Sequence, residues 1–297
     1  MAHSDRGHTE IDNPLPNRAV HRSAENSRSR LATELGIREM KEREDAFSHE
    51  LEVFRTEAQS AIQFFYAYLS INAALADNEK ALRIVNETPL FWRTNAGALQ
   101  TSYFIVLGRV FDQSSSHNID RLLQAAQDNA DIFSKEALEA RKRKGSENAG
   151  EWIEDYMKDV YVPTVSDFRR LRKHVSKYRK IYVNGYRDIR RKVFAHKELL
   201  KSDDEQQLFA KTNTREMQKL LIFLNRLYEC LWQLFHNGRK PVLRPMKYSV
   251  KAMRKAEIPK WQSGHVQEDM VHETEKFFRI LSSVPNKAIR RMRNPPR

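Results

Sequence analysis

The chain has 297 residues, with 52 Lys and Arg against 39 Asp and Glu, which gives a formal net charge of +13 at pH 7. A single cysteine, Cys230, excludes an internal disulfide framework and any multi-cysteine zinc or iron–sulfur site. No apolar run reaches the roughly 18–20 residues of a membrane-spanning helix, and the N-terminus lacks the apolar core of a secretory signal, so we expect a cytoplasmic protein without membrane contact.

The first part of the chain is predicted to be helical after a polar leader. Only 9 Gly and 10 Pro interrupt the sequence, which favours an all-α fold. Residues 1–27 have no apolar periodicity and are predicted to be a disordered leader. From residue 28 on, apolar residues recur three or four positions apart, which indicates one face of a long helix. Thr88-Pro89 is a helix start signal, and a helix over residues 90–112 is expected, in which Gly97 and Gly108 permit close helix contact.

Further helices are expected in the middle and at the end of the chain. Short helices are predicted over residues 119–126, 132–143 and 151–160. A long basic helix is predicted over residues 165–200, with a weak point at Asn184-Gly185. Thr214 is expected to cap the last strong helix, 215–235, which Gly238 ends with a left-handed residue. The prediction is thus a helical domain over residues 28–238, followed by a basic C-terminal extension over 239–297 with one possible helix at 266–281.

Positive charge is concentrated in two blocks. Residues 164–201 carry 13 basic and 3 acidic residues, and residues 239–297 carry 15 basic and 5 acidic residues. Clustered cations are typical of a polyanion binder, and nucleic acid is the commonest polyanion. The alternative is a solvated helix face with a solubilising tail. The cations expected to contact nucleic acid are Arg169, Arg170, Arg172, Lys173, Arg187 and Lys192.

Most motifs of enzyme chemistry are missing from the sequence. It has no Gly-rich phosphate loop, no serine nucleophile elbow and no paired His–carboxylate metal signature. We therefore expect neither a cofactor nor a metal. Asp203-Asp204-Glu205 is interpreted as a solvated loop.

One group of residues in the basic helix has side chains suited to catalysis. Arg190 and Arg191 precede His196 by six and five residues. A histidine can take or give a proton near neutral pH, and an arginine can clamp a phosphate. These two groups suffice for RNA cleavage, because the 2′-OH of the substrate supplies the nucleophile. The alternative is an inert histidine at the edge of the core. In a regular α-helix neither arginine shares a face with His196, so a kink or a second protomer is needed.

The run 190–196, Arg-Arg-Lys-Val-Phe-Ala-His, resembles the Arg-x(4–6)-His signature of the HEPN superfamily. It is most similar to the Arg-x-Lys-x-x-Ala-His form of AbiU-like abortive-infection proteins. Residues 104–112 and 119–123, which include Arg109 and Asp112, are similar to the upstream helices of that group. The resemblance covers about residues 50–237. HEPN proteins often carry Asn, Asp or His after the motif arginine, whereas Arg191 follows Arg190 here, so the motif arginine stays open, with Arg190 as the first choice.

The resemblance implies a HEPN-like four- to five-helix bundle that dimerises. Active HEPN proteins are metal-independent endoribonucleases, in which His is the general acid/base and Arg the phosphate clamp of a cleft shared by two protomers. It thus implies a toxin-like role in bacterial defence or stress response, RNA as the substrate, a homodimer, and an antitoxin protein as a further partner. Arg190, Arg191 and His196 would be catalytic, and Arg109 and Asp112 would support them.

Two alternatives stay open at this point. The chain can instead be a non-catalytic helical module that binds nucleic acid or a partner protein. Arg109 and Asp112 can likewise be an ordinary intrahelical ion pair three residues apart.

Overall fold

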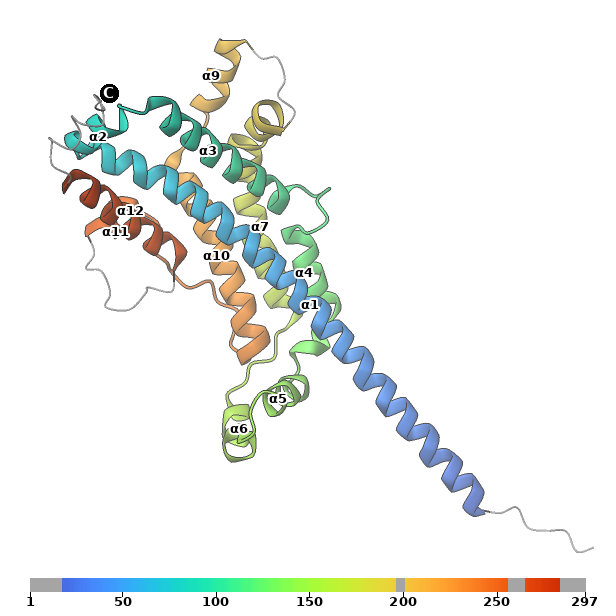
Figure 1. The fold of residues 1–297 in the computed structure, drawn as a ribbon. Coiled ribbons are helices and arrows are strands. Elements are labelled where there is room, and N and C mark those ends of the chain that lie inside the picture. The colour runs from blue at the N-terminus through green and yellow to red at the C-terminus, as the bar shows by residue number, and fades with distance from the viewer. Residues whose placement is uncertain (1–17, 196–200, 256–264, 284–297) are drawn as a thin grey trace, which may run out of the picture. The chain divides into compact units, whose positions relative to one another are not determined.

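The structure of the chain, a computed structural model, describes residues 18–195, 201–255 and 265–283. Every regular element of these residues is a helix, so the all-α prediction is confirmed (Figure 1). The chain divides into two compact units, residues 1–45 and 46–297. Helix α1 (Arg18–Ala76) begins in the first unit and ends in the second. Within the described residues, no helix is long and apolar enough to cross a membrane.

The first unit is a mostly exposed helical segment where its side chains are described. Leu35 and Ile37 are both exposed, and Arg38 pairs with Glu42 at 3.0 Å. The helix begins at Arg18, so the predicted leader boundary after residue 27 is corrected. Once a helix is nucleated it propagates until a breaker stops it, and the nearest prolines, Pro14 and Pro16, lie before Arg18. Residues 1–17 of the predicted leader lie outside the described residues.

The second unit is a helical bundle around α10 (Thr214–Asn237), which buries side chains on nearly every side. The second half of α1 and α7 (Val165–Gly185) pack against it, and α3 (Pro89–Phe111) packs on α1. Aromatic rings mark these contacts: Phe47 of α1 lies 5.0 Å from Phe235 of α10, and Tyr178 of α7 stacks on Phe223 at 4.1 Å. Their burial removes large apolar surfaces from water, which is the main stabilising term of such a bundle.

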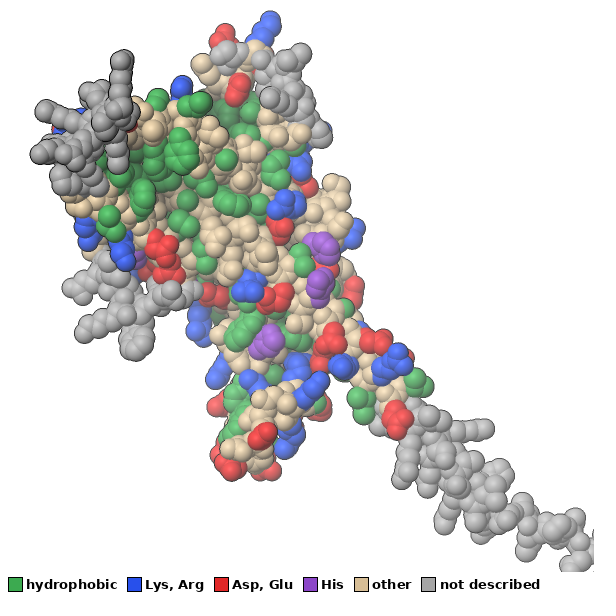
Figure 2. Space-filling model, in the orientation of Figure 1, with side chains coloured by type: hydrophobic (Ala, Val, Ile, Leu, Met, Phe, Trp, Pro, Cys, Tyr) green, Lys and Arg blue, Asp and Glu red, His purple; other side chains and the backbone are tan. Residues whose placement is uncertain are grey.

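Short helices connect the long helices of this bundle. They are α2 (Glu79–Val85), α4 (Ile119–Asp128), the 3-10 turn η1 (Ala130–Phe133), α5 (Lys135–Lys144) and α6 (Ala149–Lys158). Pro89 opens α3 as predicted, and the Asn118 side chain accepts hydrogen bonds from two backbone N–H groups of α4. Figure 2 shows hydrophobic side chains gathered over the beginning of α3, whereas charges of both signs cover α5 and α6.

The basic helix breaks where the sequence predicts a weak point. Helix α7 ends at Gly185, and the chain continues as α8 (Arg187–Ile189) and then as η2 (Arg190–Ala195), a wide π-helical turn. The predicted continuous helix to residue 200 is therefore wrong. Asn184 and Gly185 both have a low helix propensity. The Tyr186 hydroxyl also donates a hydrogen bond to the carbonyl oxygen of Asn213 at 2.7 Å, which fixes the chain at the break.

Helix α9 (Ser202–Ala210) replaces the loop expected at Asp203-Asp204-Glu205, so that interpretation is wrong. The three acidic residues form the first turn of α9. Negative side chains are favourable there because the N-terminal end of a helix carries partial positive charge.

The C-terminal extension packs on the bundle in its described part. Gly238 ends α10 in the predicted left-handed conformation, with φ of 56°, and a Cβ there would lie 2.7 Å from the side chain of Val160. Residues 239–249 then run without regular structure, and Pro241 and Tyr248 accept hydrogen bonds from Arg170 and Tyr66 through their carbonyls. Helices α11 (Val250–Lys255) and α12 (Val266–Ser283) follow. The predicted helix at 266–281 is thus present as α12, and α11 is an additional helix.

Candidate active site

The π-helical turn η2 is held by aromatic contacts. Phe194 stacks on Phe104 of α3 with 4.9 Å between ring centroids, and its edge meets Phe209 of α9 at 6.3 Å. Turns of this kind occur mostly as single insertions in α-helices and often at functional sites. His196 follows η2 directly and lies outside the described residues, so its predicted role is untested by the geometry.

Arg190 is anchored to the end of α3. Its Nη1 lies 3.1 Å from Oδ2 of Asp112, the residue that ends α3. The hydroxyl of Tyr182 donates to the other carboxylate oxygen, Oδ1, at 3.0 Å. Burial, and then the Asp112 carboxylate, raise the pKa of the Tyr182 phenol, so this group remains a donor at physiological pH. Asp112 thus joins α3 to α7 and η2 through both of its oxygens.

Gly108 provides the space for Arg190. A Cβ built on Gly108 would overlap Nε of Arg190 and lie 3.0 Å from its Cζ. The guanidinium therefore lies against the backbone of α3, and only 22% of the Arg190 side chain is exposed. The expected close helix contact is found at neither glycine: a Cβ on Gly97 would have nothing within 4 Å, and the group that approaches Gly108 is the Arg190 side chain.

A pocket of about 520 Å³ opens beside this anchor. Its charged lining residues are Asp112, Arg179, Arg187, Arg190 and Arg191. Most of these arginines have carboxylate partners: Arg179 pairs with Asp120 at 2.6 Å, and Arg187 lies 3.6 Å from Asp188. Arg191 is exposed, and no carboxylate of the described residues pairs with it. The pocket therefore combines an anchored guanidinium with an unpaired one.

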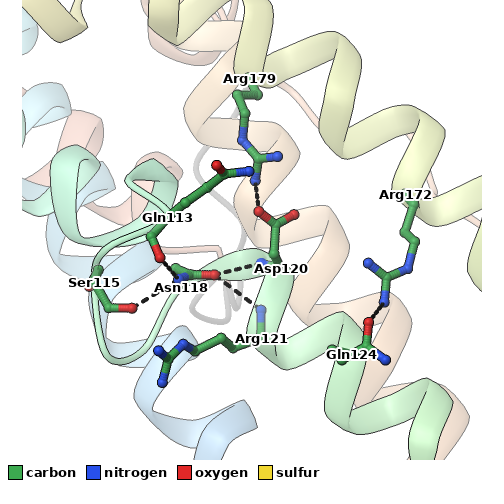
Figure 3. Close-up of polar contacts among 8 residues, drawn as sticks. All are labelled: Gln113, Ser115, Asn118, Asp120, Arg121, Gln124, Arg172 and Arg179. Carbon is green, nitrogen blue, oxygen red and sulfur yellow. Dashed lines mark hydrogen bonds and ion pairs between the residues drawn. The ribbon is translucent and has the colours of Figure 1, made fainter.

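Some cations predicted to bind nucleic acid are engaged in packing. Arg172 donates to the side-chain oxygen of Gln124 at 2.7 Å (Figure 3) and to that of Gln127 at 3.2 Å, which holds α7 against α4. Arg170 donates to Oδ1 of Asp167 and to the Pro241 carbonyl at 2.9 and 3.1 Å. These hydrogen bonds hold both side chains against neighbouring elements of the fold.

The other cations predicted to bind nucleic acid make fewer contacts within the fold. Arg169 and Lys173 are exposed on α7, and Lys192 is half-buried in η2. No ion pair joins any of the three to a described carboxylate. These residues remain available to a polyanion, and none of the three lines the pocket.

The structure separates the two residues predicted to support the site. Asp112 contacts Arg190, whereas Arg109 turns toward α1 and pairs with Glu57 at 2.8 Å. The alternative of an intrahelical Arg109–Asp112 pair is therefore wrong, because each side chain has a partner on another element. Sequence reasoning missed Tyr182 and Arg179, because each meets its partner only through the folding of α7 against α3 and α4. Tyr182 contacts Asp112, and Arg179 contacts Asp120 (Figure 3).

The described residues contain no cluster of metal-ligating side chains. Across residues 18–195, 201–255 and 265–283, no group of three or more His, Cys, Asp or Glu is placed to hold a metal ion. The polar groups of the described residues that line the pocket are guanidinium, carboxylate, phenol, amide and hydroxyl groups.

Comparison with known proteins identifies one family. A HEPN family model described as AbiU2 matches residues 44–252. The match includes α3, α7, η2 and α10 and ends before α12. No curated protein matches the chain, and no solved structure matches it.

Proposed function

The chain belongs to the AbiU2 family of HEPN proteins, and from that premise we propose that it is a metal-independent endoribonuclease with a toxin-like role in bacterial defence or stress response. One observation carries this proposal: Arg191 is exposed and unpaired among the described residues, at a pocket where the neighbouring Arg190 is anchored. Arg191 also stands five positions before His196. A cation and a general acid/base are the groups that this reaction needs.

The proposed reaction uses the 2′-OH of the RNA as nucleophile. His196 accepts the 2′-OH proton while the 2′ oxygen forms a bond to the adjacent phosphorus. The bond from phosphorus to the 5′ oxygen breaks, and that oxygen takes up the proton held by His196, which leaves a 2′,3′-cyclic phosphate, a 5′-OH and a neutral histidine. Arg191 binds the non-bridging oxygens and stabilises the negative charge that develops on them.

The proposal assigns different roles to the two arginines. Sequence spacing favours Arg190 as the phosphate clamp. The Asp112 carboxylate already neutralises Arg190, and burial limits its access. We therefore assign the clamp to Arg191 and make Arg190 a positioning residue that fixes η2 on α3.

The partners of this activity belong to the proposal as well. A homodimer would bring two copies of the pocket into one cleft, and an antitoxin protein would restrain the activity. The competing function is a non-catalytic module that binds nucleic acid, and the exposed side chains of Arg169 and Lys173 favour it.

Cleavage of a labelled mixed-sequence RNA in EDTA tests the proposal. The wild type is compared with His196→Ala, Arg191→Ala and the control Arg172→Ala, an arginine on the same basic stretch that contacts Gln124. We expect cleavage with cyclic phosphate ends by the wild type and the control, and none by His196→Ala. RNA retention that weakens with salt, without cleavage by any of the four proteins, would establish the binding module instead.

A further inference from the structure

Large apolar side chains are exposed at one end of the helical bundle, where α2, the beginning of α3 and the end of α12 lie together (Figure 1). Half of the ten large apolar side chains that are exposed in the described residues belong to these three helices. They are Leu82 of α2, Leu90 and Phe91 of α3, and Phe277 and Ile280 of α12. We call these five side chains the α3 apolar surface.

The three helices are packed together beneath the α3 apolar surface. Phe278 of α12 is buried with Ala81 and Val85 of α2, and Trp92 of α3 packs against the same cluster. The ring centroids of Trp92 and Phe277 are 6.5 Å apart. The exposed side chains therefore stand on a packed base, which reduces the cost of ordering them when they meet a partner.

This exposure points to a contact with something outside the chain. Leu90 is 73% exposed and Phe91 is 60% exposed. Single exposed apolar side chains are ordinary, whereas contiguous apolar patches mark sites of protein or membrane contact. None of the five side chains lines the pocket at Arg191, so the α3 apolar surface is separate from the proposed active site.

The chain that continues from the α3 apolar surface is strongly basic. Residues 276–297 contain seven Lys and Arg and no Asp or Glu, and residues 79–94 add three basic and two acidic residues. Lys276 and Arg279 are exposed on α12 and form no ion pair with a described carboxylate. The other five cations follow Ser283 and lie outside the described residues. This charge favours an anionic partner.

The α3 apolar surface favours lipid among the anionic partners. Three of its five side chains are aliphatic, which suits acyl chains, whereas the bases of a nucleic acid stack on aromatic rings. A second copy of the chain is disfavoured, because a two-fold contact uses the same patch on both copies and would bring two basic stretches together. An anionic bilayer takes up apolar side chains at the boundary of its acyl chains and attracts Lys and Arg to its headgroups.

We propose that the α3 apolar surface binds the face of an anionic lipid bilayer, with the basic residues of 276–297 at the headgroups. The contact is peripheral and needs no spanning helix. The expectation of no membrane contact rests on the absence of a spanning segment, so it does not cover a contact of this kind.

The bilayer and the proposed active site would lie at opposite ends of α3. Phe91 is near its beginning and Asp112 ends it, which separates the two by roughly 30 Å at 1.5 Å per residue. The pocket at Arg191 would therefore stay open to RNA, and either proposal can fail without the other.

Binding of the intact protein to large unilamellar vesicles tests the proposal. Flotation through a density gradient compares vesicles of phosphatidylcholine alone with vesicles of equal parts phosphatidylcholine and phosphatidylglycerol. We expect at least tenfold tighter binding to the anionic vesicles, and this preference should fall at high salt, which screens exposed charges. Equal binding to both kinds of vesicle, or binding to neither, would overturn the proposal.

Apolar variants assign the contact to the α3 apolar surface. Phe91→Ser/Ile280→Ser should weaken binding to the anionic vesicles at least tenfold, and thermal unfolding checks that it folds. The control, Val165→Ser/Val242→Ser, removes two exposed apolar side chains elsewhere and should bind as the wild type does. Equal losses in the two variants would contradict the assignment.

Charge variants test the electrostatic part of the contact. Lys276→Gln/Arg279→Gln should weaken binding to the anionic vesicles about fivefold or more, because each cation near an anionic surface adds to the attraction. The control, Lys177→Gln/Lys180→Gln, removes the same charge from exposed lysines of α7 and should bind as the wild type does. A control that loses as much would show a response to net charge alone.

Trp92 reports whether the α3 apolar surface reaches the acyl chains. Lipids brominated on their acyl chains quench tryptophans that lie close to them, and the chain has four tryptophans. We expect quenching of the wild type on anionic vesicles and its loss in Trp92→Phe. Quenching that Trp92→Phe leaves unchanged would place another part of the chain in the bilayer.

Two further measurements identify the competing partners. A wild type that dimerises in analytical ultracentrifugation and does not bind vesicles, with a monomeric Phe91→Ser/Ile280→Ser variant, would assign the surface to a second copy. Single-stranded RNA that displaces the wild type from vesicles and binds this variant more weakly would assign it to nucleic acid. Either result would overturn the proposal. RNA cleavage by the same variant reports on the ribonuclease proposal alone.

Discussion

The two ends of the basic stretch use their arginines in different ways. At the start of α7, Arg170 and Arg172 are held by neighbouring side-chain and backbone oxygens, and they tie α7 to the C-terminal segment and to α4. At the other end, Arg190 is anchored, but Arg191 is exposed and has no carboxylate partner among the described residues. Both ends are equally basic in sequence. The partner of each guanidinium, rather than the number of charges, separates structural arginines from those that can bind a ligand.

The largest effect of this difference between the two ends is expected at Arg191. Arg191→Ala should lower the rate of RNA cleavage by about 10²-fold, because one preorganised donor to a developing anion contributes roughly that much. Arg191→Lys should recover only part of it, since an ammonium cannot bind phosphate bidentately. Single-turnover cleavage measures the rate, and thermal unfolding checks that both variants fold. If Arg172→Ala reduced activity as much, the distinction between the two ends would fail.

The next effect concerns stability at the start of α7. Asp167→Asn should lower the free energy of unfolding by about 1–3 kcal/mol, because it removes a buried acceptor of several hydrogen bonds. Asp167 is 3% exposed, and its Oδ2 accepts from the Thr164 N–H and hydroxyl and from the Tyr161 hydroxyl. Denaturant unfolding at pH 7 measures the loss, and RNA cleavage by the folded variant should be unchanged.

The same residue predicts a pH dependence. Burial alone would raise the pKa of Asp167, but the hydrogen bonds from Thr164 and Tyr161 and the charge of Arg170 outweigh it and lower the pKa below its usual value. The folded state is therefore stabilised above the pKa of the unfolded chain, and this contribution is lost as the pH falls through the folded pKa. The stability difference between wild type and Asp167→Asn should shrink between pH 7 and pH 3. A constant difference would contradict the assigned cause.

A smaller effect is expected at Gly108. Gly108→Ala should displace the Arg190 side chain from Asp112, because the new Cβ takes the space of the guanidinium. Alanine also gains about 1 kcal/mol of helix propensity over glycine, which offsets the broken ion pair, so the melting temperature should change little. Cleavage should fall by roughly tenfold as η2 loses its anchor, which corresponds to about 1.4 kcal/mol. Unchanged cleavage would show that Arg190 does not position the site.

The smallest effect is expected for the exposed cations of α7. Arg169→Ala/Lys173→Ala should reduce the slope of log affinity against log salt concentration for single-stranded RNA by about 1.4, because each phosphate that a cation neutralises adds about 0.7 to that slope. Arg170→Ala/Arg172→Ala should instead lower stability and leave the slope nearly unchanged. Binding titrations at several salt concentrations measure this. The reverse pattern would show that Arg170 and Arg172, rather than Arg169 and Lys173, contact the nucleic acid.

Local signals in the sequence predicted the parts of the fold that depend on neighbouring residues. Pro89 opens α3, Gly238 ends α10, and the basic helix breaks at Asn184-Gly185, each for a reason that lies within one turn of the chain. The contact of Arg190 with Asp112 could not be predicted, because it depends on how α3 packs against α8 and η2. Helices α2 and α11 are too short for apolar periodicity to show.

The candidate site was predictable in composition but not in arrangement. The motif singled out Arg190 and Arg191, and the upstream helix pattern singled out Asp112. Only the fold shows which arginine is anchored and that Arg109 pairs with Glu57 instead. Burial and partner choice are properties of packed elements, so residue spacing alone leaves them undetermined.

The π-helical turn of η2 has a consequence for how this family can change over time. Such a turn contains one residue more than an α-helical turn, so it behaves as the trace of a single inserted codon. Loss of one codon here, such as that for Val193, would restore α-helical spacing and rotate every later residue by about 100° around the axis relative to Arg190. A one-codon deletion that leaves the net charge intact would thus be enough to change the register of the chain after η2 relative to Arg190.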